Sequence, residues 1–149
     1  KPLHFGYTRM KGGNGRLDYT PWINAFVYPE PDAKAIEVPI VILADLNSAS
    51  LSEAVVMAIK ALPNSTFVGE TTWGATGPLT DEEVYNDGQF KINDFLTVLT
   101  SSCSFKYVDG KIYEGIGFSP DISVPYNSSA ISNGKDIQLE KAISILQNE

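Results

Sequence analysis

A continuous apolar run at residues 38–44, rich in β-branched side chains, constrains the fold more than any other feature of this chain. Such a run is typical of a strand buried on both faces, as in a parallel sheet covered by helices. After a polar turn at 45–50, apolar residues recur at helical spacing, at Leu51, Val55, Ala58, Ile59 and Leu62. Pro63 ends this helix, and residues 66–69 predict the next strand. The segment therefore predicts a strand–helix–strand unit in an α/β domain.

The rest of the chain predicts further strands and a second helix. Strands are expected at 4–7, 95–101, 104–108 and 111–114, with an extended segment at 120–125. Asp109-Gly110 is a hairpin signal before the fourth of these strands. Residues 71–93 are interrupted by glycine and proline, and they predict a loop with little regular structure. The last element is a helix at 136–147, with Asp136 as its N-cap and an apolar side formed by Leu139, Ala142, Ile143 and Leu146.

Length, charge and residue counts narrow the functional classes. The 149 residues fit one domain that can bury a core, and the net charge of −7 argues against nucleic acids and anionic membranes as partners. No apolar stretch is long enough to span a bilayer. The single cysteine and the single histidine exclude a disulfide framework and a multi-histidine metal site, so we expect neither cofactor nor metal. Cys103 is expected to pack in the core, and His4 is expected to be structural.

The polar turn before the first helix contains the serine that is best placed to act as a nucleophile. Ser50 lies where a parallel strand ends and a helix begins, which is where open α/β sheets place their sites. The N–H groups and the dipole of the helix can stabilise a developing oxyanion there. The spacing of Ser50 and Glu53 also fits a capping box, in which Ser50 caps the helix and Glu53 reaches back. Taken alone, the spacing favours the cap, since capping serines are common.

Three blocks of sequence, in matching order and spacing, resemble the serine peptidases of the C-terminal processing protease and tricorn-core family. They are residues 38–43 running into 47–53, then residues 68–74, then residues 115–122. The resemblance implies a Clp-protease/crotonase-like α/β fold. It also implies that residues 1–149 are the C-terminal portion of a peptidase catalytic domain whose upstream regions lie outside this chain.

The resemblance assigns Ser50 to the position of the nucleophile and the N–H of Leu51 to one half of the oxyanion hole. The processing-protease branch uses a Ser–Lys dyad, but Ala75 stands at the lysine position here. The tricorn-like branch uses Ser, His and a carboxylate, and Glu114 takes the position of that carboxylate. Its histidine and the second oxyanion amide belong to regions before Lys1. We therefore expect this chain alone to hydrolyse almost nothing.

The leading hypothesis is the core of a periplasmic or extracellular serine endopeptidase that acts on peptides or unfolded proteins with the help of upstream domains, as the resemblance implies. The chief alternative is a non-catalytic peptide-binding or scaffold module of the same fold, in which Ser50 is only a helix cap. Ala75 and the missing base favour that alternative. A third hypothesis, a small-ligand or carbohydrate-binding domain that uses Trp22, Trp73 and the tyrosines, has no motif in its support.

Overall fold

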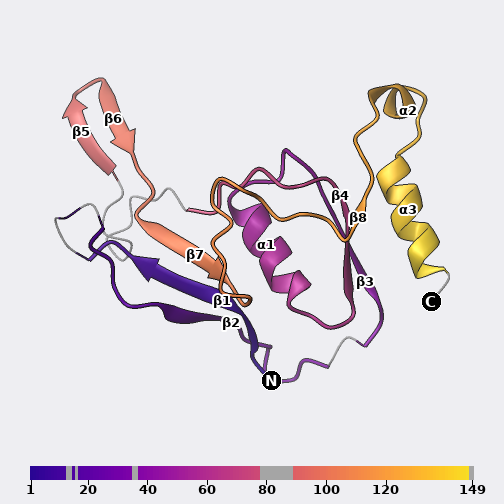
Figure 1. Ribbon diagram of the computed structural model, residues 1–149, viewed down its shortest axis with the longest axis horizontal. Coiled ribbons are helices and arrows are strands. Elements are labelled where there is room, and N and C mark those ends of the chain that lie inside the picture. Colours follow the sequence, from indigo (N-terminus) through magenta and orange to yellow (C-terminus); the bar gives the residue numbers. More distant parts are fainter. Residues whose placement is uncertain (13–14, 16, 35–36, 78–88, 148–149) are drawn as a thin grey trace.

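The computed structural model describes residues 1–12, 15, 17–34, 37–77 and 89–147. The elements in chain order are β1 (Leu3–Met10), β2 (Ile23–Val27), β3 (Ile40–Ala44), α1 (Leu51–Lys60), β4 (Ser65–Gly69), β5 (Gln89–Asn93), β6 (Leu96–Leu99), β7 (Cys103–Tyr107), β8 (Ile122–Ser123), α2 (Ser128–Ser132) and α3 (Ile137–Leu146). Helix α1 lies between two small sheets, β3-β4-β8 and β2-β1-β7 (Figure 1). The predicted α/β class is confirmed.

The predicted strand–helix–strand unit is present as β3, α1 and β4. β3 and β4 pair in parallel, with Ile42 opposite Phe67, and β8 adds a short third strand in the same direction. The buried core at this sheet is made of Ile42, Ala44, Val56, Met57, Phe67 and Phe118. The opposite face of β3 is less covered than the apolar run predicts: α3 packs against this strand, yet Leu43 keeps 40% of its surface exposed.

The core-facing side of α1 differs from the predicted stripe. Leu51 and Val55 are 77% and 49% exposed, whereas Glu53, Val56 and Met57 are buried. The helical spacing of apolar residues predicted the wrong face because Glu53, a charged residue, occupies a core position. Glu53 can be buried there since three N–H and O–H groups donate hydrogen bonds to it.

The second sheet packs on the other side of α1. Its central strand, β1, is antiparallel to both β2 and β7, so the strands predicted at 4–7 and 104–108 are confirmed. Gly6 faces the helix, and a Cβ on it would lie 2.5 Å from the carbonyl oxygen of Lys106 and 3.0 Å from Cε of Met57. Glycine therefore allows α1 and β7 to approach β1 this closely.

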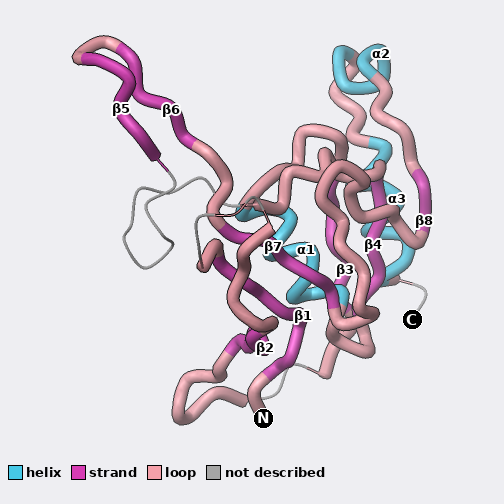
Figure 2. The backbone as a smooth tube through the Cα atoms, turned by 60° about the vertical axis from the view of Figure 1, so that its left-hand side comes forward, coloured by secondary structure: helices cyan, strands magenta, loops and turns pink. Residues whose placement is uncertain are grey.

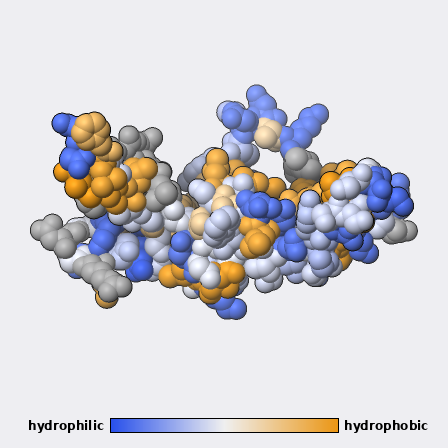
Figure 3. All heavy atoms as spheres, turned by 90° about the horizontal axis from the view of Figure 1, so that it is seen from above, coloured by the Kyte–Doolittle hydropathy of each residue, from blue (hydrophilic) through white to orange (hydrophobic). Residues whose placement is uncertain are grey.

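Strands β5 and β6 form a hairpin that projects from the body of the molecule (Figures 1 and 2). β6 confirms the strand predicted at 95–101, but β5 shows that the loop predicted over 71–93 is wrong at its end. Residues 70–77 lack regular secondary structure, as expected, and 78–88 lie outside the described residues. Apolar side chains gather at this end of the molecule (Figure 3), and Phe95 in the turn is 98% exposed.

The C-terminal segment contains two helices. α3 is the predicted last helix, and the Asp136 side chain caps it by accepting hydrogen bonds from the N–H groups of Gln138 (3.1 Å) and Leu139 (3.0 Å). Its predicted apolar side is only partly covered, because Ala142 is buried while Ile143 remains 45% exposed. The short helix α2 was not predicted. None of the helices in the described part of the chain has the length and apolar character needed to cross a bilayer.

Candidate active site

Ser50 lies at the corner between β3 and α1 in a strained backbone conformation. Its φ of 56° and ψ of −119° make it the one non-glycine residue with a positive φ among the described residues. Conformations of this kind persist where the surrounding structure enforces them, and they cluster at functional sites. Ser50 is exposed, and its hydroxyl has no hydrogen-bond partner in the described part of the chain. The corner thus presents a free hydroxyl to solvent.

The capping box predicted for Ser50 and Glu53 is wrong. Ser50 makes no side-chain cap hydrogen bond, because its backbone does not adopt the extended conformation of a capping residue. Glu53 is fully buried and turns to the loop after β4 instead. Its carboxylate accepts hydrogen bonds from the hydroxyl of Thr72 (2.6 Å) and from the N–H groups of Gly74 (2.8 Å) and Ala75 (2.8 Å).

The loop at 70–77 runs past the Ser50 corner and is bonded to it. Ser50 N–H donates to the carbonyl oxygen of Ala75 (2.9 Å), and Trp73 N–H donates to that of Ser48 (3.0 Å). Ala75, which stands where the processing-protease branch has its lysine, therefore lies beside Ser50. The alanine side chain has no amine that could act as a base.

Leu51 opens helix α1 directly after Ser50. Its N–H is one of the N-terminal amides that have no partner within a helix, and no hydrogen bond among the described residues uses it. The positive end of the helix dipole lies at the same place. An oxygen anion formed next to the Ser50 hydroxyl would find both an unused donor and a favourable field here.

Glu114 lies in a turn, so the returning strand predicted at 111–114 is wrong. The Asp109-Gly110 turn itself forms, with Gly110 N–H donating to Tyr107 O (2.9 Å). The Glu114 carboxylate oxygen Oε2 accepts three hydrogen bonds from the loop at 70–77, from Thr76 N–H (2.7 Å), Thr76 Oγ1 (2.8 Å) and Gly77 N–H (2.8 Å). These bonds hold the Glu114 carboxylate against Thr76 and Gly77, the two residues that follow Ala75 in the loop.

A backbone crossing joins the loop at 70–77 to the segment 113–118. Gly115 N–H donates to Gly74 O (2.6 Å), and the Thr72 hydroxyl accepts from Phe118 N–H (2.8 Å) while it donates to Glu53. Gly117 has a φ of 78°, and a Cβ on it would lie 2.0 Å from the carbonyl oxygen of Thr72. Sequence reasoning missed Thr72 and Glu53 as the organisers of this site, because no local pattern connects Glu53 to the loop at 70–77.

A hollow of about 230 Å³ lies beside Glu114. Its lining consists of Tyr19, Ser101, Cys103, Ser104 and Glu114. Cys103 is buried, as predicted, and burial raises the pKa of its thiol despite an opposing hydrogen bond with Ser102. The thiol therefore stays protonated at neutral pH and is a poor nucleophile.

His4 lies in β1, within a group of aromatic rings. Its ring centre is 4.8 Å from that of Tyr7 and 5.1 Å from that of Phe26. This position agrees with the structural role expected for His4. Within the described residues, no group of three His, Cys, Asp or Glu side chains could hold a metal ion.

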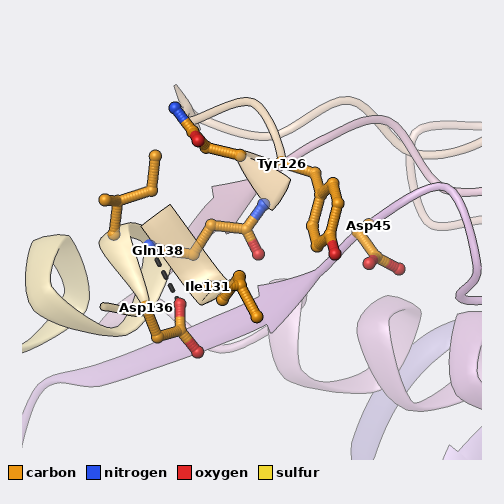
Figure 4. A pocket seen from close by; sticks show the side chains of 7 residues that line it. Asp45, Tyr126, Ile131, Asp136 and Gln138 are labelled. Atoms are coloured by element: carbon orange, nitrogen blue, oxygen red, sulfur yellow. Dashed lines mark hydrogen bonds between the residues drawn. The ribbon is translucent and has the colours of Figure 1, made fainter. Parts of the chain in front are cut away.

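A second hollow, of about 180 Å³, lies at the carboxyl end of β3 (Figure 4). Tyr126 and Asp45 lie on one side of it, and Asp136 and Gln138 from the start of α3 lie on the other. The Asp136 carboxylate is already used in capping α3. Asp45 belongs to the turn that leads from β3 to Ser50, whereas Tyr126 and Asp136 belong to the C-terminal segment.

The family follows from comparison with known proteins. A sequence model of peptidase family S41 matches residues 7–124. The chain belongs to this family. The resemblance to C-terminal processing proteases and the tricorn core is thereby confirmed. No curated protein matches the sequence.

Several solved structures are similar to this S41 chain. A candidate peptidase from Parabacteroides merdae superposes with a TM-score of 0.80 at 27% identity, over 98% of this chain and 43% of its own. A photosystem II D1 C-terminal processing protease gives a TM-score of 0.56 at 18% identity, over 83% and 28% of the two chains. The tricorn protease gives 0.58 at 24% identity, over 74% and 10%. The S41 chain thus has the Clp-protease/crotonase-like fold and spans less than half of each of these structures.

Proposed function

We propose that this chain carries the nucleophile, Ser50, of a serine endopeptidase. The observation that supports the proposal best is the Ser50 corner, where a strained backbone holds an exposed hydroxyl that has no hydrogen-bond partner in the described part of the chain. A hydroxyl that served only as a helix cap would be bonded to the amides of α1. Membership of family S41 adds that the bond to be cleaved is a peptide bond.

In the proposed reaction the Ser50 oxygen attacks the carbonyl carbon of the substrate, and its proton passes to a histidine base. The carbonyl oxygen becomes an anion, which the N–H of Leu51 and the N-terminus of α1 stabilise. The base returns the proton to the leaving amine as the peptide bond breaks, and an ester remains on Ser50. Water then attacks this ester and gives a proton to the base; the bond to the Ser50 oxygen breaks, the acyl part leaves as a carboxylic acid, and the base returns the proton to Ser50. Loss of one oxyanion donor typically costs about 3 kcal/mol in such reactions.

We assign Glu114 to the orientation of the histidine. Its Oε2 atom is fixed by Thr76 and Gly77, so the carboxylate holds its charge at a defined place next to the loop that borders Ser50. A fixed carboxylate orients an imidazole and stabilises the imidazolium that forms during the attack. The proposal requires an imidazole between Glu114 and Ser50.

The proposed base comes from outside this chain. Ala75 offers no amine, and His4 lies within its aromatic group on β1. We therefore expect the 149 residues alone to hydrolyse almost nothing. The complete protein would act on peptides or unfolded proteins with its upstream domains, in the periplasm or outside the cell, as the resemblance to secreted processing proteases implies.

The test is hydrolysis of an unfolded protein substrate by the full-length protein and by two variants. Ser50→Ala is expected to abolish hydrolysis, and Ser52→Ala, an exposed serine two residues further along, is expected to leave it unchanged. Equal activity of Ser50→Ala and the unsubstituted protein would overturn the proposal. Absence of hydrolysis in the full-length protein itself, together with tight peptide binding, would favour the non-catalytic module instead.

A further inference from the structure

The face of the sheet β2-β1-β7 that points away from α1 carries alternating cations and aromatic rings. The guanidinium carbon of Arg9 lies 4.2 Å from the centre of the Tyr19 ring and 4.5 Å from that of Trp22. The ammonium of Lys106 lies 4.5 Å from Trp22 and 4.5 Å from Tyr7. We call this set, which also includes Lys11 at 5.1 Å from Tyr19, the cation–aromatic row: Tyr7, Arg9, Lys11, Tyr19, Trp22 and Lys106.

The orientation of the row follows from the pleat of β1. Gly6 faces Met57 of α1, so Tyr7 and then every second residue, Arg9 and Lys11, project from the opposite face. Lys106 pairs with Tyr7 across the sheet and shares that face. Rings on both sides reduce the freedom of the two cations before any partner arrives, which lowers the entropy lost on binding.

The two central cations, Arg9 and Lys106, have no anionic partner among the described residues. Within the described residues neither Arg9 nor Lys106 forms a salt bridge, and Nε of Arg9 is buried without a hydrogen-bond partner. A charged donor left without an acceptor is unfavourable. Because two rings lie against the guanidinium and Nε is buried, we expect an anion to approach the edge that carries the two Nη atoms. A carboxylate is suited to that edge, since its two oxygens match the fork of the guanidinium.

The spacing of the cations matches an extended polypeptide. Lys106 stands at the level of Tyr7, and Arg9 and Lys11 follow at successive positions on the same face. Neighbouring levels are about 6.6 Å apart, twice the rise per residue of a strand. Side chains at alternate positions of an extended peptide have the same separation. The row therefore fits a strand with an acidic residue at every second position.

We propose that the cation–aromatic row binds an extended polypeptide segment with Asp or Glu at alternate positions. The carboxylates pair with Arg9 and Lys106; Lys11 continues the row, although its ammonium already donates to the carbonyl oxygen of Gly15. The chain as a whole has a net charge of −7, so this cluster of cations differs in sign from the rest of the molecule and is complementary to an acidic segment. The proposal does not involve Ser50 and is tested without any measurement of hydrolysis.

The test measures binding of two fluorescein-labelled peptides of identical composition to the full chain by fluorescence anisotropy. One peptide alternates Glu with Thr, and the other carries the same residues as a block of Glu followed by a block of Thr. The alternating peptide is expected to bind more tightly than the block peptide. Its affinity should fall as salt is added, because salt screens the charges. Arg9→Gln and Lys106→Gln are each expected to weaken it about tenfold, the usual effect of losing a charge-assisted hydrogen bond. Lys111→Gln, an exposed lysine beside Asp109, is the matched control and should change nothing.

Three results would overturn the proposal. Equal affinity for the two peptides would contradict the match in spacing. Binding of heparin but of neither peptide would identify the row as a site for sulfated glycans. Full affinity in both Arg9→Gln and Lys106→Gln, with circular dichroism spectra that show native folding, would mean that the peptide binds elsewhere.

Discussion

Ser50 donates its backbone N–H to the carbonyl oxygen of Ala75 across 2.9 Å, and the N–H of Ala75 donates in turn to the buried carboxylate of Glu53 across 2.8 Å. Ala75 is thus fixed from both sides. The conformation of the Ser50 corner therefore depends on a carboxylate that lies beneath it in α1. Because Glu53 also binds Thr72 and Gly74, one side chain holds most of the loop that borders the candidate nucleophile.

Glu53→Gln is expected to destabilise the protein. Glutamine can still accept hydrogen bonds at its oxygen, but its amide group would place N–H donors against donors of the loop. A buried donor left without an acceptor costs about 1–3 kcal/mol. Urea unfolding followed by circular dichroism measures this loss, and Glu140→Gln in the first turn of α3 serves as the exposed control. Equal midpoints for the two variants would contradict the role of Glu53.

The crossing of the two loops predicts different effects of alanine at two glycines with similar φ. Gly117 (φ 78°) and Gly134 (φ 73°) are equally unfavourable for alanine in backbone terms. A Cβ at Gly117 would lie 2.0 Å from Thr72 O, whereas nothing lies within 4 Å of one at Gly134. Thermal melts should therefore show a much larger loss for Gly117→Ala than for Gly134→Ala, which should lose only about 1 kcal/mol. Similar losses would mean that the loops do not meet as described.

The strained corner predicts the stabilities of two variants at Ser50. Ser50→Ala should change the free energy of unfolding by less than about 0.5 kcal/mol, because the hydroxyl makes no hydrogen bond to the described residues, whereas a true cap would lose about 1 kcal/mol. Ser50→Gly should be more stable than Ser50→Ala by about 1 kcal/mol, since glycine adopts a positive φ without strain. Chemical denaturation of both variants measures the difference. A less stable Ser50→Gly variant would argue against strain at this position.

Asp121 predicts a loss of stability in acid. Partial burial raises the pKa of its carboxyl, but the hydrogen bond from Phe67 N–H and the ammonium of Lys60 outweigh that effect and hold the pKa below its usual value. The stabilisation is present above the pKa of the unfolded chain, about 3.9, and is lost as pH falls through the lower folded value. Asp121→Asn should flatten the dependence of unfolding free energy on pH below about pH 4. Asp94→Asn, at a side chain that is 86% exposed, should leave that dependence unchanged.

The sequence predicted those parts of the fold that depend on local patterns. The apolar run before Asp45 and the spacing after Ser50 located β3 and α1, and the Asp136 cap located the start of α3. The face of α1 was wrong because periodicity counts apolar residues and places Glu53 in solvent. The partners that allow Glu53 to be buried come from a loop about twenty residues away, which no local pattern includes.

The segments around Glu114 and the hairpin illustrate the same limit. Residues 111–114 follow a good hairpin turn, yet they form no strand, because Glu114 is drawn to Thr76 and Gly77. Residues 89–93 alternate polar and apolar side chains, a strand signal that the preceding glycine obscured. The position of Ser50 at the corner could be predicted, but its strain could not, since the loop at 70–77 imposes part of it.

Whether Ser50 is the nucleophile is decided by covalent labelling of the full-length protein with a fluorophosphonate, followed by mass spectrometry of the peptide that contains residues 47–53. We expect a single phosphonyl adduct on Ser50, none in Ser50→Ala and an undiminished adduct in Ser52→Ala. A folded full-length protein in which Ser50 stays unmodified, or in which the adduct is on another serine, would contradict the role of Ser50 as the nucleophile.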